Sequence, residues 1–265
     1  MSAYTSRDFS RPEHLQFVKE LEQASPSGSK AFYTLFEDFL TLSWAALAQL
    51  VHRMQTMAQG SPLDEKIEAE YMRVVKQYKP EQVKHFAAAM GIMTQSLQSE
   101  GGVHDFLGEV YGRTGISNKW GGQFFTPWPI CQLMAKFTLG DELPEHRITI
   151  QEPAVGGGAM LLAIAEEMRV RELSARRWWF DATDVDIRCA RMAYVQLSTI
   201  DAPGIVRHGN TISGDQYAAW LTPAGALFPM RWEKREQPES DPIAVPSVAA
   251  QKEATQLVEE QLQLL

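Results

Sequence analysis

One stretch, residues 147–161, constrains the fold more than any other part of the chain. It reads RITIQEPAVGGGAML: a β-prone apolar run, an acidic residue, a proline, three glycines and a second apolar run. This order predicts a buried strand at 148–151, a glycine turn and a helix at 158–170. Ligands of open α/β sheets bind just outside the carboxyl ends of the strands. Glycines let the backbone approach a ligand, and the helix start offers unpaired N–H groups.

The residues that follow repeat this alternation of strand and helix. Further strands are predicted at 178–185 and 204–208, with a helix at 187–199 between them. Alternating strands and helices are typical of a parallel sheet in an α/β fold. Residues 216–221 are expected to form a short helix, and residues 224–228 a weak fourth strand.

The first part of the chain is predicted to be helical. Residues 1–30 are polar with a loop at 24–29, and apolar residues then recur at three- and four-residue spacing. Helices are expected from residue 30 and at the ranges 63–78, 80–98 and 104–112. A further helix is expected to start at Thr126-Pro127, with the threonine as N-cap.

Three regions follow from this pattern. They are a helical N-terminal region at 1–118, an α/β domain at 119–231, and a linker with a C-terminal helix at 232–265. The linker prediction rests on charge and three prolines between residues 232 and 247.

Composition narrows the possible classes of protein. The formal net charge of −8 argues against strong binding to DNA by this chain alone, since duplex binding depends largely on basic residues. No apolar run reaches the roughly 18 residues of a membrane span, and the N-terminus does not resemble a signal peptide. Two cysteines lack metal-ligand spacing, so we expect reduced thiols, no metal site and a cytoplasmic location.

Candidate ligand-binding residues follow each of the three main predicted strands. They are Glu152, Gly156 and Gly158 after the first, Asp184 and Val185 after the second, and Asn210 after the third. A carboxylate after the second strand can accept hydrogen bonds from both ribose hydroxyls. Val185 can pack on an adenine face, and the Asn210 amide can hydrogen-bond its edge. The pattern therefore predicts a nucleoside-type ligand.

The glycine turn has two other interpretations. The dinucleotide fingerprint G-x-G-x-x-G fits poorly, because Leu161 stands three residues after Gly158. A purely structural turn in a sheet without a ligand is the second alternative.

Two segments together resemble a known family. GQFFTP at 122–127 and EPAVGGGAML at 152–161 look like the corresponding motifs of adenine-specific DNA methyltransferases, the modification subunits of type I restriction-modification systems. The segment DFLGEVY at 105–111 also resembles that family, and the likeness spans roughly residues 30–215. It implies a Rossmann-like S-adenosylmethionine methyltransferase sheet, here expected to be truncated, preceded by the helical region.

The resemblance also implies roles for individual residues. The methionine end of S-adenosylmethionine would be lined by Phe124, Phe125, Thr126 and Pro127. Gly156 and Gly158 would let the cofactor approach, and Glu152 stands where the family has an aspartate. Asp184 would hold the ribose, with Val185 beside the adenine. Asn210 falls where many members have an aspartate against the adenine amine.

One family motif is missing from the sequence. The catalytic tetrapeptide [ND]-P-P-[YFW], which holds the flipped target base, does not occur in these 265 residues. The catalytic residues are therefore unknown and two hypotheses stay open. The first is a DNA adenine-N6 methyltransferase whose site is degenerate or completed by a partner chain. The second is an inactive methyltransferase-like module that binds a modification or restriction complex. Partner or self-association is expected through the helical N-terminus or the C-terminal helix.

Overall fold

The structure, a computed structural model, describes residues 4–5, 7–25, 27–56, 63–99, 102–115, 125–143 and 146–229. Residues 1–230 form one compact unit and residues 231–265 a second one. The predicted linker and C-terminal helix lie outside the described residues, and the division at residue 118 stays a prediction. None of the helices in the described ranges is long and apolar enough to span a membrane.

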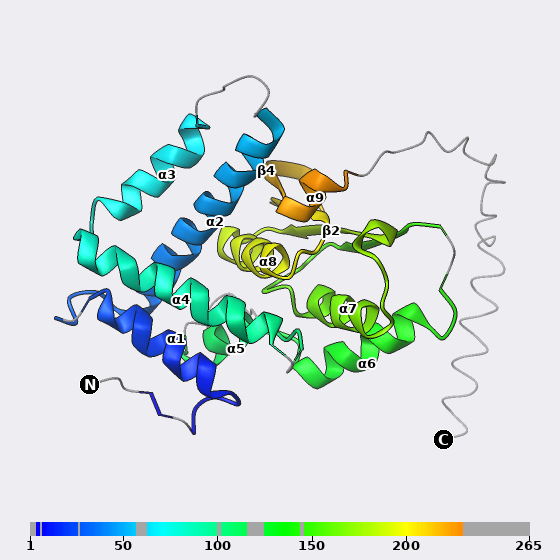
Figure 1. Cartoon of the computed structure of the whole chain (residues 1–265), viewed down its shortest axis with the longest axis horizontal. Helices are drawn as coiled ribbons and strands as arrows, with labels where there is room; N and C mark the ends of the chain where they lie inside the picture. The colour runs from blue at the N-terminus through cyan, green and yellow to red at the C-terminus, as the bar shows by residue number, and fades with distance from the viewer. Residues whose placement is uncertain are drawn as a thin grey trace, which may run out of the picture. The chain divides into compact units, whose positions relative to one another are not determined.

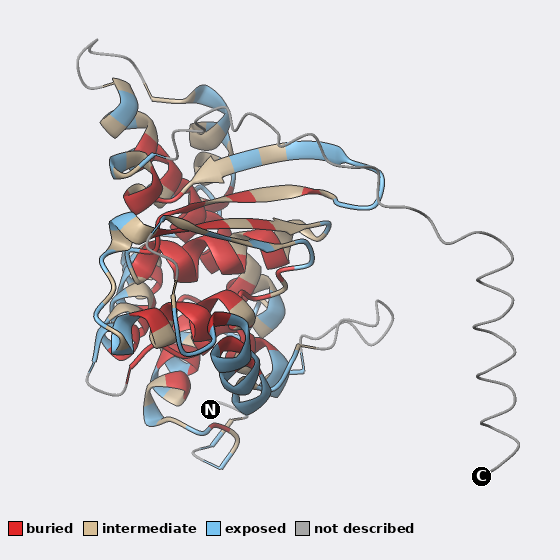
Figure 2. Ribbon diagram, turned by 90° about the vertical axis from the view of Figure 1, so that its right-hand side faces the viewer, coloured by how far each residue is buried: buried red, intermediate tan, exposed pale blue. Residues whose placement is uncertain are grey.

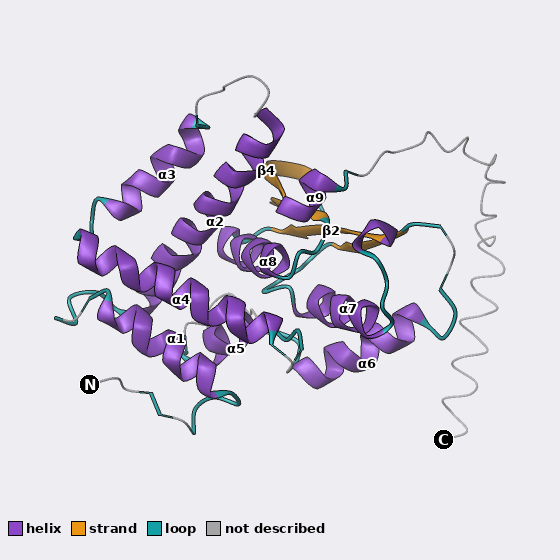
Figure 3. Ribbon diagram, in the orientation of Figure 1, coloured by secondary structure: helices purple, strands orange, loops and turns teal. Residues whose placement is uncertain are grey.

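Five helices form the first part of the described chain (Figures 1 and 3). They are α1 (Pro12–Gln23), α2 (Phe32–Thr56), α3 (Glu65–Val75), α4 (Pro80–Gln98) and α5 (Phe106–Arg113). The predicted helices are thus present, and α4 has the expected bounds. Helix α1 was not predicted, because residues 1–30 read as polar. Its buried stripe is short, consisting of His14, Phe17, Val18 and Leu21 at helical spacing.

The helical region has an aromatic core. Phe17 packs edge-on against Phe39 and Phe106, with ring centroids 4.9 and 5.3 Å away. All three side chains are fully buried. Such edge-to-face pairs add about 0.5–1.5 kcal/mol beyond the burial of their apolar area. This core joins α1, α2 and α5.

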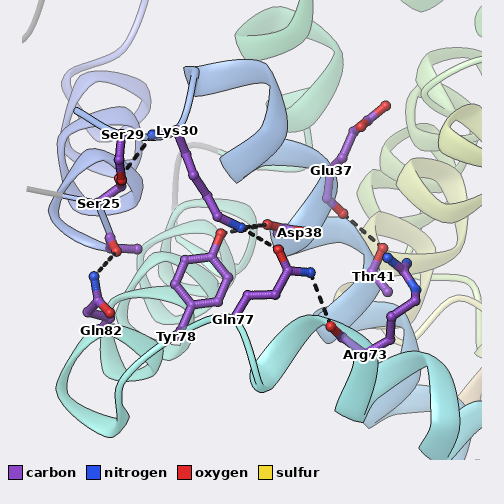
Figure 4. Close-up of polar contacts among 11 residues, drawn as sticks. Ser25, Ser29, Lys30, Glu37, Asp38, Thr41, Arg73, Gln77, Tyr78 and Gln82 are labelled. Atoms are coloured by element: carbon purple, nitrogen blue, oxygen red, sulfur yellow. Dashed lines mark hydrogen bonds and ion pairs between the residues drawn. The ribbon is translucent and has the colours of Figure 1, made fainter. Parts of the chain in front are cut away.

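A polar cluster fixes the start of α2 against the turn between α3 and α4 (Figure 4). The Lys30 ammonium donates to Asp38 Oδ2 at 3.0 Å and to Gln77 Oε1 at 2.8 Å. Tyr78 donates its hydroxyl to the same Asp38 oxygen at 2.5 Å, and Lys30 Nζ lies 4.2 Å from the Tyr78 ring centroid. Each polar group of this half-buried cluster has a partner, as stable burial requires.

The second half of the described chain is a four-stranded sheet with helices against it (Figure 2). The strands β1 (Ile148–Glu152), β2 (Trp178–Asp184), β3 (Gly204–Asn210) and β4 (Asp215–Leu221) lie in sequence order. The first three are parallel, as predicted. Helix α7 (Ala159–Val170) connects β1 to β2 and α8 (Ile187–Thr199) connects β2 to β3. Helix α6 (Trp128–Leu139) packs against α7.

Two short elements differ from the prediction. Residues 216–221, expected as a helix, belong to β4 (Asp215–Leu221), which pairs antiparallel with β3. Residues 224–228, expected as a weak strand, lie mostly in helix α9 (Pro223–Leu227) instead. The cause is local: Gly214 at φ 79° allows the tight turn, and Thr222 caps α9 by accepting from Gly225 N at 3.0 Å. Period alone does not distinguish strand from helix in runs this short.

The helical region and the sheet are joined through α8. The Arg191 guanidinium donates to Thr41 Oγ1 at 2.9 Å and lies 4.3 Å from the Trp44 ring centroid. Gln98 donates to the carbonyl of Thr199 at 3.0 Å. Helix α2 therefore packs directly on a helix of the sheet, and both parts belong to one compact unit.

Candidate functional site

The glycine loop at residues 153–158 links β1 to α7 and has a backbone that favours glycine. Gly156 has φ 54° and Gly158 has φ 103°, both in the left-handed region. Gly158 is also the N-cap of α7, and no side chain caps this helix. The first N–H groups of α7 are therefore available to a polar group of a ligand.

Asp184, at the end of β2, holds this loop. Its Oδ2 accepts from Gly156 N at 2.8 Å, and its Oδ1 accepts from Asp186 N at 2.9 Å. One residue earlier, the Thr183 carbonyl accepts from Val155 N at 2.9 Å. The carboxylate predicted to bind ribose thus also fixes the loop beside it.

A second carboxylate, Glu152, lies beside Asp184. Burial raises the pKa of Glu152, and the neighbouring Asp184 raises it further. Burial also raises the pKa of Asp184. Two half-buried carboxyl groups therefore lie at the strand ends, and Glu152 lines the cavity beside the glycine loop. This environment favours a ligand that donates hydrogen bonds or carries positive charge.

The segment before α6 reaches the glycine loop. A cavity of about 140 Å³ is lined by both segments, including Phe125, Thr126, Glu152 and Gly156. Phe125 packs on Tyr111 of α5, with ring centroids 5.3 Å apart. Pro127 lines a neighbouring larger cavity instead. Phe124 lies outside the described residues.

The third strand end belongs to the same edge. Thr211 donates its hydroxyl to the carbonyl of Pro153 at 2.7 Å, which ties this end to the glycine loop. Asn210 Oδ1 accepts from Ile212 N at 3.0 Å and from Ser213 N at 3.3 Å. Val185 is 63% exposed, as expected of a residue that could cover a ligand's apolar face.

The start of α6 differs from the prediction. The N-cap is Pro127 and the helix begins at Trp128, with a second proline, Pro129, in its first turn. Thr126 is therefore not the cap. Its carbonyl receives the Cys131 thiol at 3.5 Å, and its side chain lies exposed at both cavities. Pro129 stands two residues after Pro127, and its fixed φ suits the first turn of a helix.

Two residues of the site region were not singled out from the sequence. Gln196 of α8, fully buried, donates its amide to Asp105 Oδ1 at 2.9 Å and to the Gly157 carbonyl at 2.8 Å. The side-chain oxygen of Gln196, Oε1, accepts from Leu107 N at 2.9 Å. This one amide joins α5 and the glycine loop. Asp105 opens the segment that resembles the family, whereas Gln196 carries no sequence signal.

Both cysteines of the sequence lie in the described ranges. No group of three or more metal-ligating side chains is found there. Cys131 and Cys189 are buried and unbridged. Burial raises the pKa of Cys131 to about 11, so this thiol is neutral near pH 7.

The family model of the N-6 DNA methylases matches residues 102–236, just over half of the chain. The chain therefore belongs to the N-6 DNA methylase family. No curated protein sequence matches it.

Two solved structures are similar to parts of the chain. One is the type I restriction-modification system methyltransferase subunit from Streptococcus thermophilus, with 14% identity and a TM-score of 0.38. It matches over 72% of this chain and 57% of that one. The other is a Listeria monocytogenes protein assigned as a class I S-adenosylmethionine-dependent methyltransferase, with 11% identity and a TM-score of 0.33. It matches over 71% of this chain. The matched part is 52% of the Listeria protein. The chain therefore spans only about half of the length of each of these two proteins.

Proposed function

We propose that the protein binds S-adenosylmethionine and methylates the exocyclic amine of adenine in DNA, as part of a restriction-modification type system. The observation that carries the proposal is the hydrogen bond from Gly156 N to Asp184. This bond supports the proposal because the Asp184 carboxylate, proposed to bind the ribose, lies against a left-handed glycine loop in a chain that belongs to the N-6 DNA methylase family. Such a pairing at the carboxyl ends of parallel strands suits a nucleoside.

Each predicted residue has a role in this proposal. Asp184 accepts hydrogen bonds from the ribose hydroxyls, while Val185 covers one face of the adenine. Asn210 hydrogen-bonds the adenine edge. The methionine end lies toward Thr126, flanked by Phe125 and Pro127, and Gly156 and Gly158 allow the close approach. Phe124, outside the described residues, keeps the role that the resemblance implies. Glu152 replaces the family's aspartate with one more methylene. When bound, S-adenosylmethionine supplies a methyl group on a sulfonium, which an amine nitrogen can attack.

The net charge of the chain bears on how it would bind DNA and whether it needs a partner. With a net charge of −8, this chain is expected to hold DNA weakly by itself. We therefore propose that a partner chain, or a second copy, supplies DNA contacts and the missing target-base residues. A restriction-modification role also implies the cytoplasm as the location.

A second candidate function is a catalytically inactive methyltransferase-like module that binds a modification or restriction complex. Two observations favour it. No [ND]-P-P-[YFW] tetrapeptide occurs in the sequence. Helix α6 also exposes Ile130, Leu133, Met134 and Phe137, with Phe137 at 76%. Contiguous exposed apolar side chains mark surfaces that bind other proteins.

Methyl transfer separates the two candidates. The full chain is incubated with labelled S-adenosylmethionine and mixed adenine-containing DNA, alone and with cell extract supplying partners. The enzymatic proposal predicts label in N6-methyladenine, lost in Asp184→Ala. Cofactor binding without incorporation under either condition would support the binding module and reject the enzyme.

A further inference from the structure

Two cavities meet at the segment before α6. The smaller one, about 140 Å³, contains the glycine loop. The larger one, about 660 Å³, lies toward α5 and is lined by Asp105, Glu109, Tyr111 and Trp128 among others. Phe125 and Thr126 line both. The cavity at the glycine loop and the cavity at α5 therefore share one segment of their lining.

Asp105 lies between the larger cavity and the glycine loop. It lines the larger cavity, although the residue is only 9% exposed. A Cβ added to Gly157 would lie 3.5 Å from Asp105 Oδ1, so there is little room between this oxygen and the loop. Gln196 fixes this position by donating one amide to both Asp105 and Gly157.

The charge of Asp105 is only partly balanced. Its Oδ1 accepts from Gly108 N at 3.0 Å and from Gln196 Nε2 at 2.9 Å. Within the described ranges, Oδ2 accepts no hydrogen bond and neither oxygen is paired with a lysine or arginine. A buried carboxylate without a cation is unstable, and burial accordingly raises the pKa of Asp105.

Glu109, the other carboxylate on the larger cavity, differs in this respect. It accepts from Ser10 N at 2.8 Å and from Ser10 Oγ at 2.7 Å, and His14 Nδ1 lies 3.5 Å away. Its hydrogen-bonding capacity is thus used within the protein. Asp105 therefore has one carboxylate oxygen available to a ligand, whereas both oxygens of Glu109 already accept hydrogen bonds within the protein.

We propose that Asp105 binds the positively charged amine at the amino-acid end of an S-adenosyl ligand, and that Gln196 holds the Asp105 carboxylate against the glycine loop for this purpose. The inference rests on the proposed cofactor site. The ammonium supplies the cation that Asp105 lacks, next to the segment expected to line the methionine end. Asp105 therefore distinguishes ligands that carry the amino-acid end from nucleosides that lack it.

Binding of matched ligands tests the inference by calorimetry on the full chain. S-Adenosylhomocysteine carries the amine, whereas 5′-methylthioadenosine lacks the whole amino-acid end. In Asp105→Asn, we expect affinity for S-adenosylhomocysteine to fall roughly 10- to 100-fold, the usual value of a charged hydrogen bond. Affinity for 5′-methylthioadenosine should stay within about twofold. Glu109→Gln is the matched control and should affect neither ligand.

A wild-type measurement makes the test independent of how well Asp105→Asn folds. The 2-oxo acid analogue of S-adenosylhomocysteine, in which a keto group replaces the amine, should bind the wild-type chain roughly 10- to 100-fold more weakly. Equal binding of the two, or equal loss of both test ligands in Asp105→Asn, would overturn the role of Asp105 and leave the proposed cofactor site standing. Failure of the wild-type chain to bind any of these nucleosides would overturn both.

Discussion

At the scale of single residues, the glycine loop depends on backbone conformations that other residues adopt only with strain. Gly158 combines φ 103° with close packing, since a Cβ there would lie 3.4 Å from the Ala193 Cα. Both the conformation and the contact oppose any side chain. The loop is thus fixed by its own glycines as well as by Asp184.

Gly158→Ala should therefore destabilise the protein by about 1–2 kcal/mol, through left-handed strain and crowding. Gly91→Ala is the control. Gly91 lies inside α4 with no atom within 4 Å of an added Cβ, so this change should stabilise by about 0.5–1 kcal/mol. Chemical denaturation measures both. Equal effects of the two substitutions would contradict the assigned loop conformation.

A buried histidine makes stability depend on pH. Burial lowers the pKa of His104 from 6.5 to about 4. The unfolded chain therefore binds a proton at a higher pH than the folded chain does. The stability contributed by neutral His104 is present above pH 6.5 and is lost as the pH falls toward 4, by on the order of 2–3 kcal/mol.

His104→Gln should flatten this part of the pH profile. The measurement is the free energy of unfolding at pH 7, 6, 5 and 4 for both proteins. The difference between them isolates His104 from the carboxylates, which titrate in both. Parallel profiles for the two proteins would show that His104 is not buried in its neutral form.

At the scale of elements, α6 and α7 use their apolar residues differently. Leu161 of α7 is 1% exposed and lies in the core, whereas Phe137 of α6 is 76% exposed. Only Cys131, Ala135 and Leu139 of α6 are buried. Most of the apolar surface of α6 thus faces away from the described core.

Matched alanine substitutions test this difference. Leu161→Ala should destabilise by about 2–5 kcal/mol, because it leaves a cavity in the core. Phe137→Ala should change stability by less than about 0.5 kcal/mol, as is usual for exposed sites. Thermal unfolding at low protein concentration measures both. A large loss in Phe137→Ala would mean that this side chain is covered in the folded protein.

Elements with a long and regular apolar period were predictable from the sequence. Helix α8 has the predicted bounds, and the three parallel strands were placed correctly. Helix α1 and the short elements β4 and α9 were not predictable. Their apolar patterns are short, so contacts with the rest of the fold decide whether each segment forms a helix or a strand. The positions of Glu152, Asp184 and Asn210 at the strand ends were predictable from residue type and order, and their part in a binding site stays a prediction. Gln196 was not, because only the fold brings this buried amide to Gly157 and Asp105.

At the scale of the whole molecule, the helical region and the sheet share α8. Arg191, on that helix, bonds Thr41 and packs on Trp44, both in α2. The Trp44 ring also lies 5.2 Å from the Trp220 ring of β4. Neither part can lose these contacts without exposing apolar surface of the other.

The two regions should therefore unfold together. We expect one cooperative transition, with far-ultraviolet circular dichroism and tryptophan fluorescence giving the same midpoint. Arg191→Ala should lower this midpoint for both signals by the same amount, because it weakens a shared contact. Two separate transitions would instead support independent folding of the helical region and the α/β domain.

The central claim is that the carboxyl ends of the strands form an S-adenosylmethionine site. Calorimetric titration of the full chain with S-adenosylmethionine tests it most directly, with Asp184→Ala as the comparison. We predict binding of one cofactor per chain by the wild type. Affinity in Asp184→Ala should be lower by an amount on the order of 1–3 kcal/mol, from loss of the ribose contact. No binding by a correctly folded wild-type chain would contradict the claim.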